Sequence, residues 1–478
     1  MTGPALTLSS RTWQWHGGGD MMQWDTLLSA KRLGRDRTDT PRPERSPFQR
    51  DYDRIVFSSA FRRMQDKTQV FPLAESDYVR TRLTHSLEAA CVGRSLGTMI
   101  GERIAQRPTG SSIHPSDVGA IVAAACLAHD IGNPPFGHSG EDAIRLWFER
   151  SEVARPFHAL LSEEQRADFT RFEGNAQGFR VLSALQMPDN RGGLQLTCAT
   201  LGAFAKYPVT AAGCGKGRVS TRKSSFFRSE IGLFREVAAE TGMLPRPPEA
   251  NGADPAQWCR HPLAFAVEAA DDICYRLVDF EDGVRIGILS YEEVRDAFAG
   301  LLVDPKKHLL RAEKMQREKE RIEFLRAVAI GDVLAQVCDV FLAHEEALLH
   351  GEFETPLIEC TAVAEPLRVI EKRSRETIYS SARGLEIEVA GFQVIGGLLD
   401  LVVGAVEERA ARREGGYSGR TRTLLRLIPE QFIGPGREPS RDPYTRLQLM
   451  TDFIAGMTDS YAVGLYKKLC GISLPGQR

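Results

Sequence analysis

The feature that most constrains this chain is a run at residues 118–129 made almost wholly of alanine, valine, isoleucine, leucine and cysteine. Such a composition predicts a helix that is apolar on every side, and a helix of this kind is stable only when other elements surround it. A proline opens the run at residue 115, and the glycine and tandem prolines of residues 131–135 end it. We therefore expect a fold built around one central helix, with His129 and Asp130 at its end.

Helical patterns also dominate the rest of the chain, after an irregular stretch at residues 32–48 that is rich in arginine, aspartate and proline. Thr84 resembles the cap of a helix that runs to about Arg103. Further helices are expected from about His138, over residues 262–279, in several amphipathic pieces over residues 291–349, and over residues 444–469. Strand-like alternation is confined to residues 386–394. The sequence predicts an all-α fold with few short strands.

The bulk composition limits the class of protein. With 42% hydrophobic residues and a net charge of -2, the chain can bury a large core and is unlike a disordered or nucleic-acid-coating protein. It has no run of about 18 uncharged apolar residues, so we expect no transmembrane helix and no membrane partner. Nine scattered cysteines without a C-x-x-C pair are typical of reduced thiols, which favours a cytoplasmic location.

Four residues form the chemically informative set: His85, His129, Asp130 and Asp271. Ionisable side chains beside an apolar helix are costly unless they are paired or bind a metal. Two imidazoles with two carboxylates provide mixed nitrogen and oxygen ligands, which suit Mn²⁺, Fe²⁺ or Mg²⁺ better than a thiolate-rich structural zinc site does. From these residues alone, a hydrogen-bonded core histidine at position 85 stays open.

Longer strings accompany this set and carry a family resemblance. Its order, His85, then His129-Asp130, then a distant aspartate, resembles the HD superfamily of metal-dependent phosphohydrolases. The closer resemblance is to deoxyguanosine triphosphate triphosphohydrolases, and it spans most of the chain from about Trp24. It rests on SAFRRM at residues 59–64, KTQV at 67–70, RTRLTHS at 80–86, AHDIGNPPFGHSGE at 128–141, FEGNAQ at 172–177, KYP at 206–208, EAADDICY at 268–275 and IAGMTD at 454–459.

The resemblance implies an HD-domain helical core and three stretches of chain. Residues 1–48 would be a partly irregular arm, residues 49–290 the HD catalytic core, and residues 291–478 a helical region packed on that core. One large helical unit is expected rather than two separate domains. Residues beyond about Arg285 are expected to support the fold more than the chemistry.

The family pattern also selects Asp271 over Asp272 as the metal ligand. In the family, the metal aspartate is followed by a tyrosine four residues later and an aspartate eight residues later, and Tyr275 and Asp279 match that spacing. Positions four residues apart share a helix face, which agrees with this choice. The resemblance implies that Tyr275 stacks under the sugar and Asp279 binds the 3'-hydroxyl.

Other family positions imply the remaining site residues. His138 would donate a proton to the leaving oxygen, and Glu141, three residues on, would orient the imidazole. The candidates for binding the triphosphate are Arg82, Lys206 with Tyr207 beside it, and Lys223 in the acid-free loop at residues 210–225. Gln69 would lie near the base and sugar, and Asn175 would contribute to the pocket.

The expected activity is metal-dependent hydrolysis of deoxynucleoside triphosphates, with dGTP favoured, to deoxynucleoside and triphosphate. The alternatives are another HD reaction on monophosphates or phosphodiesters, and a non-catalytic nucleotide- or DNA-binding regulator. The resemblance further implies a homo-oligomer, often a hexamer in relatives, and nucleotide or single-stranded DNA effectors. The basic arm at residues 32–54 is a candidate for DNA contact.

Overall fold

The computed structural model describes residues 21–36, 44–69, 80–107, 113–246, 256–379, 382–412 and 416–472. Over these ranges the chain forms 22 α-helices and no β-strand, with only isolated β-bridges such as Arg32 to Thr197. The all-α class is confirmed, but the few short strands expected do not form there. Residues 386–394, which alternate like a strand, lie within α18 (Ala382–Ala411).

The predicted central helix is α5 (Pro115–Ala128), and it is buried from Val118 to its end. It packs against α4 (Arg82–Ala105), α2 (Pro47–Val56), α10 (Cys198–Phe204) and α12 (Pro262–Arg285). A Cβ on Gly97 of α4 would lie 2.9 Å from the Val118 carbonyl oxygen, and one on Gly101 would lie 2.8 Å from the Pro115 Cα. No side chain fits at these positions, so α4 and α5 meet backbone to backbone.

Helix α4 begins two residues before Thr84, because Thr81 is its N-cap. The Thr81 side chain accepts from the Thr84 backbone N–H, and the Thr84 hydroxyl accepts from the Thr81 N–H. Thr84 is therefore the third residue of a capping box rather than the cap. This reciprocal pair of bonds holds the first turn of α4, which places His85.

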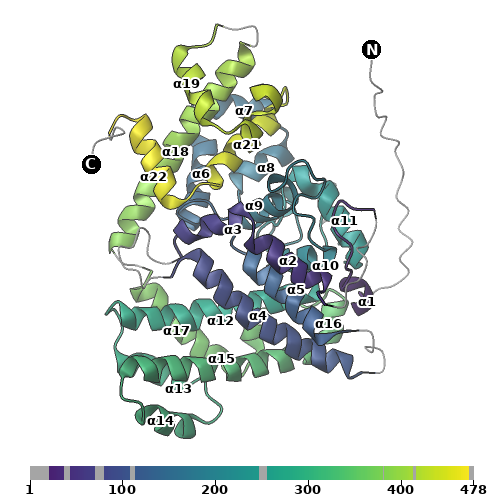
Figure 1. The fold of residues 1–478 in the computed structure, drawn as a ribbon, viewed down its shortest axis with the longest axis vertical. Helices are drawn as coiled ribbons and strands as arrows, with labels where there is room; N and C mark the ends of the chain where they lie inside the picture. The colour runs from purple at the N-terminus through teal and green to yellow at the C-terminus, as the bar shows by residue number, and fades with distance from the viewer. Residues whose placement is uncertain are drawn as a thin grey trace.

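Buried side chains form two hydrophobic clusters, which we call the first and the second cluster. The first surrounds α5 and includes α2, α4, α10, α12 and α15 (Glu318–Ala343). The second surrounds α18 and includes α6 (His138–Arg150), α8 (Glu163–Thr170), α21 (Pro443–Ala455) and α22 (Asp459–Leu469). In Figure 1 the helices α18 to α22 gather at the top of the molecule, and α12 to α17 lie at the bottom.

The expected helices at residues 291–349 are confirmed as α13 (Tyr291–Ala299), α14 (Pro305–Glu313), α15 and α16 (Glu345–Leu349). The single closing helix is wrong, because residues 456–458 separate α21 from α22 and Thr458 caps the latter. The remaining helices are α1 (Trp24–Leu27), α3 (Ser59–Arg63), α7 (Arg155–Leu160), α9 (Gly174–Arg180), α11 (Ile231–Thr241), α17 (Ala364–Thr377), α19 (Gly419–Leu427) and α20 (Glu430–Ile433).

The helix α18 is one that composition alone did not single out. Within Leu385–Ala411 the most apolar 18-residue window has a mean hydropathy of 1.9, and by length and composition the helix could cross a membrane. Half of its most apolar window is buried within the protein, where it packs against α6, α19, α21 and α22. These contacts are those of a core helix of the second cluster.

Helices from both sides of residue 290 contribute to each cluster. In the first cluster α12 packs against α15, and in the second α6 packs against α18. The C-terminal region is thus packed on the region before it, while the proposed division at residues 48 and 290 stays a prediction. Residues 1–20 and 37–43 of the expected arm lie outside the described ranges.

Candidate active site

The four predicted metal ligands come together from α4, from α12 and from the turn that follows α5. The nitrogen and oxygen atoms offered by His85, His129 and Asp130 lie within 4.8 Å of one another. Asp271 Oδ1 lies 3.0 Å from His85 Nε2 and 3.4 Å from His129 Nε2. Two imidazole nitrogens and two carboxylates therefore converge, and this donor set fits a divalent cation such as Mn²⁺, Fe²⁺ or Mg²⁺.

Neighbouring groups orient these side chains. His129 Nδ1 lies 2.6 Å from the Cys126 carbonyl oxygen, so Nδ1–H donates to the backbone and Nε2 faces the cluster. Asp130 accepts hydrogen bonds from Arg82 Nη1 at 2.5 Å and from the Asn133 side chain. His129 and Asp130 are thus each held by a partner outside the cluster, as metal ligands usually are.

Attraction to neighbouring basic side chains keeps the two aspartates ionised. Burial alone would raise the pKa of Asp130, but Arg82 and the two histidines lower it to about 2. Burial likewise opposes ionisation of Asp271, whose pKa is held well below its usual range by His129 and by its bond to His85. Burial disfavours a charged His85, yet its bond to Asp271 raises its pKa to about 9. Two carboxylates thus attract positive charge to this point.

His138 and Glu141 form a second pair, at the start of α6 in the second cluster. His138 Nδ1 lies 2.9 Å from Glu141 Oε2, and the other oxygen of Glu141 accepts from the Gly174 backbone N–H at 2.6 Å. Glu141 is buried, whereas the His138 side chain is 78% exposed. Burial would raise the pKa of Glu141, but its bond to His138 and the charge of Lys223 hold it lower. The imidazole therefore has a carboxylate partner on Nδ1 and an accessible Nε2.

The loop between the metal ligands and this pair has a restricted backbone. Phe136 and Gly137 both adopt positive φ, 65° and 57°. A Cβ on Gly137 would lie 2.5 Å from Arg82 Nη2, so a larger residue there would require a shift of Arg82 in addition to the unfavourable positive φ. This conformation turns the chain from Asp130 into α6 and brings His138 to the same cavity as the ligands.

Two lysines that line the same cavity supply positive charge. Lys206 Nζ lies 3.2 Å from Glu268 Oε1 and 5.8 Å from the centre of the Tyr207 ring, and Lys223 Nζ lies 3.1 Å from Glu173 Oε2. Burial would lower their pKa values, but Glu268 raises that of Lys206, and Glu141 and Glu173 raise that of Lys223. Both side chains remain charged and can attract a polyanion.

These groups surround a cavity of about 550 Å³. Of the thirteen predicted site residues, His85, Glu141 and Asp279 lie behind its wall. The other ten line it: Gln69, Arg82, His129, Asp130, His138, Lys206, Tyr207, Lys223, Asp271 and Tyr275, together with the expected Asn175. Gln69 Oε1 is buried without a hydrogen-bond partner among the described residues, which leaves an acceptor for a ligand.

Asp279 does not reach the cavity, in contrast to what its spacing from Asp271 suggests. It is fully buried and accepts a hydrogen bond from the Tyr379 hydroxyl at 2.7 Å. Eight residues of a helix turn about 80° past a whole number of turns, so Asp279 points away from the face of Asp271. Its expected contact with a 3'-hydroxyl would require Tyr379 to move.

Sequence reasoning missed the contribution of the C-terminal half to this cavity. Arg375, Tyr379, Ile387 and Glu388 line it, although residues beyond about Arg285 were expected to serve the fold. The Tyr379 ring stacks on that of Tyr275, with centroids 5.3 Å apart and planes 3° from parallel. No motif marks Tyr379, and it lies about a hundred residues from Tyr275, so only the packing of α17 against α12 reveals it.

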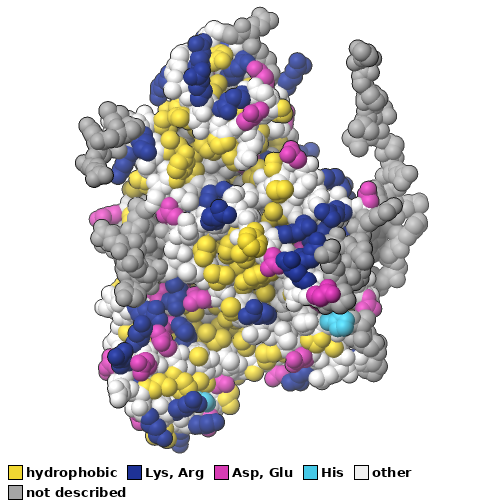
Figure 2. Space-filling model, viewed as in Figure 1, with side chains coloured by type: hydrophobic (Ala, Val, Ile, Leu, Met, Phe, Trp, Pro, Cys, Tyr) yellow, Lys and Arg dark blue, Asp and Glu magenta, His cyan; other side chains and the backbone are white. Residues whose placement is uncertain are grey.

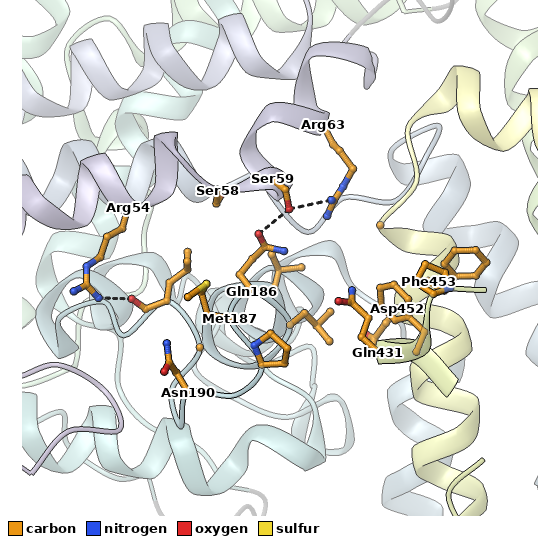
Figure 3. A pocket seen from close by; sticks show the side chains of 18 of the residues that line it. Arg54, Ser58, Ser59, Arg63, Gln186, Met187, Asn190, Gln431, Asp452 and Phe453 are labelled. Carbon is orange, nitrogen blue, oxygen red and sulfur yellow. Dashed lines mark hydrogen bonds between the residues drawn. The ribbon is translucent and has the colours of Figure 1, made fainter. Parts of the chain in front are cut away.

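A larger cavity of about 970 Å³ lies apart from these residues, between α2, α3 and the turn after α21 (Figure 3). Within it Arg54 donates to the Leu194 carbonyl at 2.6 Å, and Ser59 bonds to Gln186. Hydrophobic side chains gather on this face of the molecule, over α3, with basic side chains beside them (Figure 2). The described residues that line it include no histidine, and its carboxylate Asp452 is already bonded to Arg180.

Comparison with known proteins agrees with this geometry. Residues 82–173 match the family model of the HD domain, which contains three of the four predicted ligands and both residues of the His138–Glu141 pair. HD domains are metal-dependent, and the His85, His129 and Asp130 cluster is able to bind a metal. The fold and site are thus those of an HD-domain hydrolase.

Relatives define the family more narrowly. The chain is 44% identical over 468 residues to a deoxyguanosinetriphosphate triphosphohydrolase-like protein of Synechocystis, covering 95% of this chain and 100% of that protein. It is 40% identical to a protein of the same description from Pseudomonas aeruginosa, at the same coverage. It is 30% identical to a deoxyguanosinetriphosphate triphosphohydrolase of Yersinia enterocolitica, covering 88% of this chain and 93% of that enzyme. The chain belongs to the deoxyguanosinetriphosphate triphosphohydrolase family of the HD superfamily.

Proposed function

We propose that the protein hydrolyses deoxynucleoside triphosphates, dGTP preferentially, to deoxynucleoside and inorganic triphosphate. The observation that carries the proposal is the meeting of three charged groups at one cavity. These are the ligand set on the first cluster, the His138–Glu141 pair on the second, and the ammonium groups of Lys206 and Lys223. A monophosphate or a phosphodiester would not need two lysines beyond the reacting phosphate.

The ligand set would be His85, His129, Asp130 and Asp271, holding Mn²⁺, Mg²⁺ or Fe²⁺. A cation bound there would polarise the α-phosphate and lower the pKa of a bound water. Lys206 and Lys223 would bind the β- and γ-phosphates before charge moves toward them. Arg82, which pairs with Asp130, would orient that ligand and also lie beside the phosphates.

The leaving oxygen would be protonated by His138. Water attacks the α-phosphorus, the bond from that phosphorus to O5' breaks, and the proton on His138 Nε2 passes to O5'. Glu141 accepts from Nδ1–H, which keeps the ring oriented. The hydroxyl of the water stays on the triphosphate, the remaining proton of the water is released to solvent, and His138 regains its proton from solvent. The products are a deoxynucleoside and an intact triphosphate.

The sugar would lie on Tyr275. Its ring, backed by Tyr379, forms a flat wall of the cavity, and close packing there would leave no room for a 2'-hydroxyl. Gln69, whose Oε1 has no hydrogen-bond partner within the described part of the chain, would bind near the sugar and base. The preference for guanine rests on the descriptions of the relatives.

The wider setting also stays a proposal. We infer a cytoplasmic homo-oligomer, with nucleotides or single-stranded DNA as candidate effectors. The nine cysteines are all free, which suits a reducing compartment.

The test is to incubate the purified protein with Mn²⁺ or Mg²⁺ and each of the four deoxynucleoside triphosphates, and to separate the products by ion exchange. Deoxynucleoside with intact triphosphate is the expected pair, formed fastest from dGTP. Monophosphate with pyrophosphate would instead show that the bond between the α- and β-phosphates breaks, and no turnover with any metal would favour a binding protein.

A further inference from the structure

Asp459, the first residue of α22, lies against the wall of the active-site cavity although it belongs to the C-terminal end of the chain. It is 1% exposed. Its Oδ2 accepts from the Thr68 backbone N–H at 3.0 Å and from the Thr68 hydroxyl at 2.7 Å. Its Oδ1 accepts from the Phe136 backbone N–H at 3.0 Å. One carboxylate thus joins two segments that both line the cavity.

The hydrogen bond between Phe136 and Asp459 affects the position of His138. Phe136 is one of the few non-glycine residues with positive φ, a conformation that side-chain-bearing residues disfavour. It persists only where the surroundings hold it. The charge-assisted bond from its N–H to Asp459 is such a restraint, and His138 begins α6 only two residues later.

A neighbouring lysine strengthens the same junction. Lys67, which precedes Thr68, is 3% exposed and donates from Nζ to the Ala455 carbonyl at 3.0 Å and to the Asn133 carbonyl. The loop at residues 133–137 is therefore bonded to the end of α21 through Lys67 and to the start of α22 through Asp459. The turn at residues 456–458 between these helices also lines the larger cavity of Figure 3.

We propose that Asp459 is a positioning residue for the reaction: it holds the backbone of Phe136 so that His138 meets the leaving oxygen. Its effect on turnover rests on the proposed function, whereas its effect on the loop does not. Within the described part of the chain, Asp459 bonds to neither the ligand set nor His138, so it acts through the loop alone. An error of about 1 Å in placing a catalytic group can cost about 100-fold in rate.

The test compares Asp459→Asn with Ser460→Ala. The amide introduced at position 459 has the same shape as the carboxylate but offers one acceptor oxygen in place of two, so either Thr68 or Phe136 loses its bond. Ser460 is the next residue, is exposed, and bonds to Asp66 at 2.9 Å without contacting the loop. Two readouts serve: hydrogen exchange of a peptide covering residues 131–141, and kcat and KM for dGTP with a Mn²⁺ titration.

In Asp459→Asn we expect faster exchange confined to residues 133–138 and a kcat lower by about 10- to 100-fold, with KM and Mn²⁺ affinity little changed. Ser460→Ala should resemble the wild type in both. In a His138→Ala background, Asp459→Asn should lower kcat little further, because both changes act on one group. Thr68→Val, which removes only the hydroxyl bond, should give a smaller effect in the same direction if Asp459→Asn folds poorly.

Unchanged exchange in Asp459→Asn would overturn the proposal, and so would losses that multiply in the double variant. Exchange and Mn²⁺ binding are measured without turnover. If the wild type hydrolyses no deoxynucleoside triphosphate, the proposed function fails, while the exchange data still decide whether Asp459 holds the loop.

Discussion

The two hydrophobic clusters place different chemistry at the same cavity. The first cluster supplies His85, His129 and Asp271 from helices that pack closely, and these side chains are bonded to one another or to backbone. The second cluster supplies His138, whose ring is 78% exposed and is held by its bond to Glu141. The proposed metal ligands are therefore pre-arranged, whereas the position of the proposed proton donor depends on that bond and on the loop that precedes it.

This contrast suits the two tasks. A cation site gains affinity when its ligands already converge, since little order is lost on binding. A proton donor must approach the leaving oxygen of a substrate that arrives and departs, and an exposed imidazole on a separate cluster allows this. Changes in the first cluster should therefore abolish metal binding, and changes in the second should slow turnover while metal binding remains.

The largest effect is expected from Asp271→Asn. The substitution keeps the shape of the side chain but removes the charge that faces both histidines, so metal-dependent turnover should fall by more than about 1000-fold and Mn²⁺ affinity should fall with it. Asp272→Asn is the matched control, because Asp272 is adjacent on α12 and does not line the cavity. Calorimetric Mn²⁺ titration and kcat with dGTP measure both. Equal losses from the two variants would show that the ligand has been assigned to the wrong aspartate.

The next effect concerns the second cluster. His138→Asn should lower kcat by about 100- to 10,000-fold, the usual contribution of a general acid, while KM and Mn²⁺ affinity change little. The exposed ring can be replaced without opening the core, so the variant should fold. Turnover close to that of the wild type would remove His138 from the mechanism. Loss of Mn²⁺ binding would contradict the expectation that metal binding depends on the first cluster alone.

A smaller effect is expected from Lys206 and Lys223, the two lysines that line the cavity. Lys223→Ala should lower kcat/KM for dGTP by about 10- to 100-fold, the cost of one charge-assisted bond to a phosphate. Lys216→Ala, in the same loop but exposed and away from the cavity, is the control. A similar loss from both would indicate that the loop attracts the substrate through its overall charge rather than through Lys223.

The smallest effect is a pH-dependent stability within the second cluster. Asp168 is buried, accepts from the Tyr444 hydroxyl at 2.6 Å, and burial raises its pKa from an ordinary 3.8 to about 7. Because the folded-state pKa is the higher one, the stabilisation is complete below about pH 4 and is lost as pH rises through about 7. Asp168→Asn cannot lose a proton and should escape this decline.

Relative to the wild type, the Tm of Asp168→Asn should therefore rise by about 1–3 °C between pH 4.5 and pH 8. Asp142→Asn, an exposed acid on α6, should show no such trend. Thermal unfolding followed by circular dichroism measures the difference, and a flat difference would mean that Asp168 is ionised in the folded protein at pH 5.

The sequence predicted correctly the features of the fold that depend on local composition. The run at residues 118–129 predicted α5 correctly, because an all-apolar helix has few other places to lie. The residues of the motif at 128–141 lie together at the cavity because they come at the end of α5 and the start of α6, on both sides of one loop. Their roles stay predictions that the variants above address.

The sequence was misleading where the same residues fit both the alternation of a strand and the spacing of a helix. It was also misleading where packing against a distant helix determines the position of a residue. In residues 386–394 glutamates alternate with apolar residues over a few positions, which imitates a strand. The apolar face of α18 instead follows Ile387, Gly391, Val394 and Leu398 at helical spacing, and Val389 is exposed. Tyr379 could not be foreseen, because its place beside Tyr275 depends on tertiary packing alone.

The backbone contact between α4 and α5 has a mechanical consequence. Gly97 and Gly101 leave no side chain between these helices where α4 meets the first turn of α5, so the separation of the two helices there is set by main chains in direct contact. A contact without voids has little volume to lose under compression. Hydrostatic pressure should therefore leave the spacing of α4 and α5 nearly unchanged at this contact, which should be among the stiffest parts of the molecule.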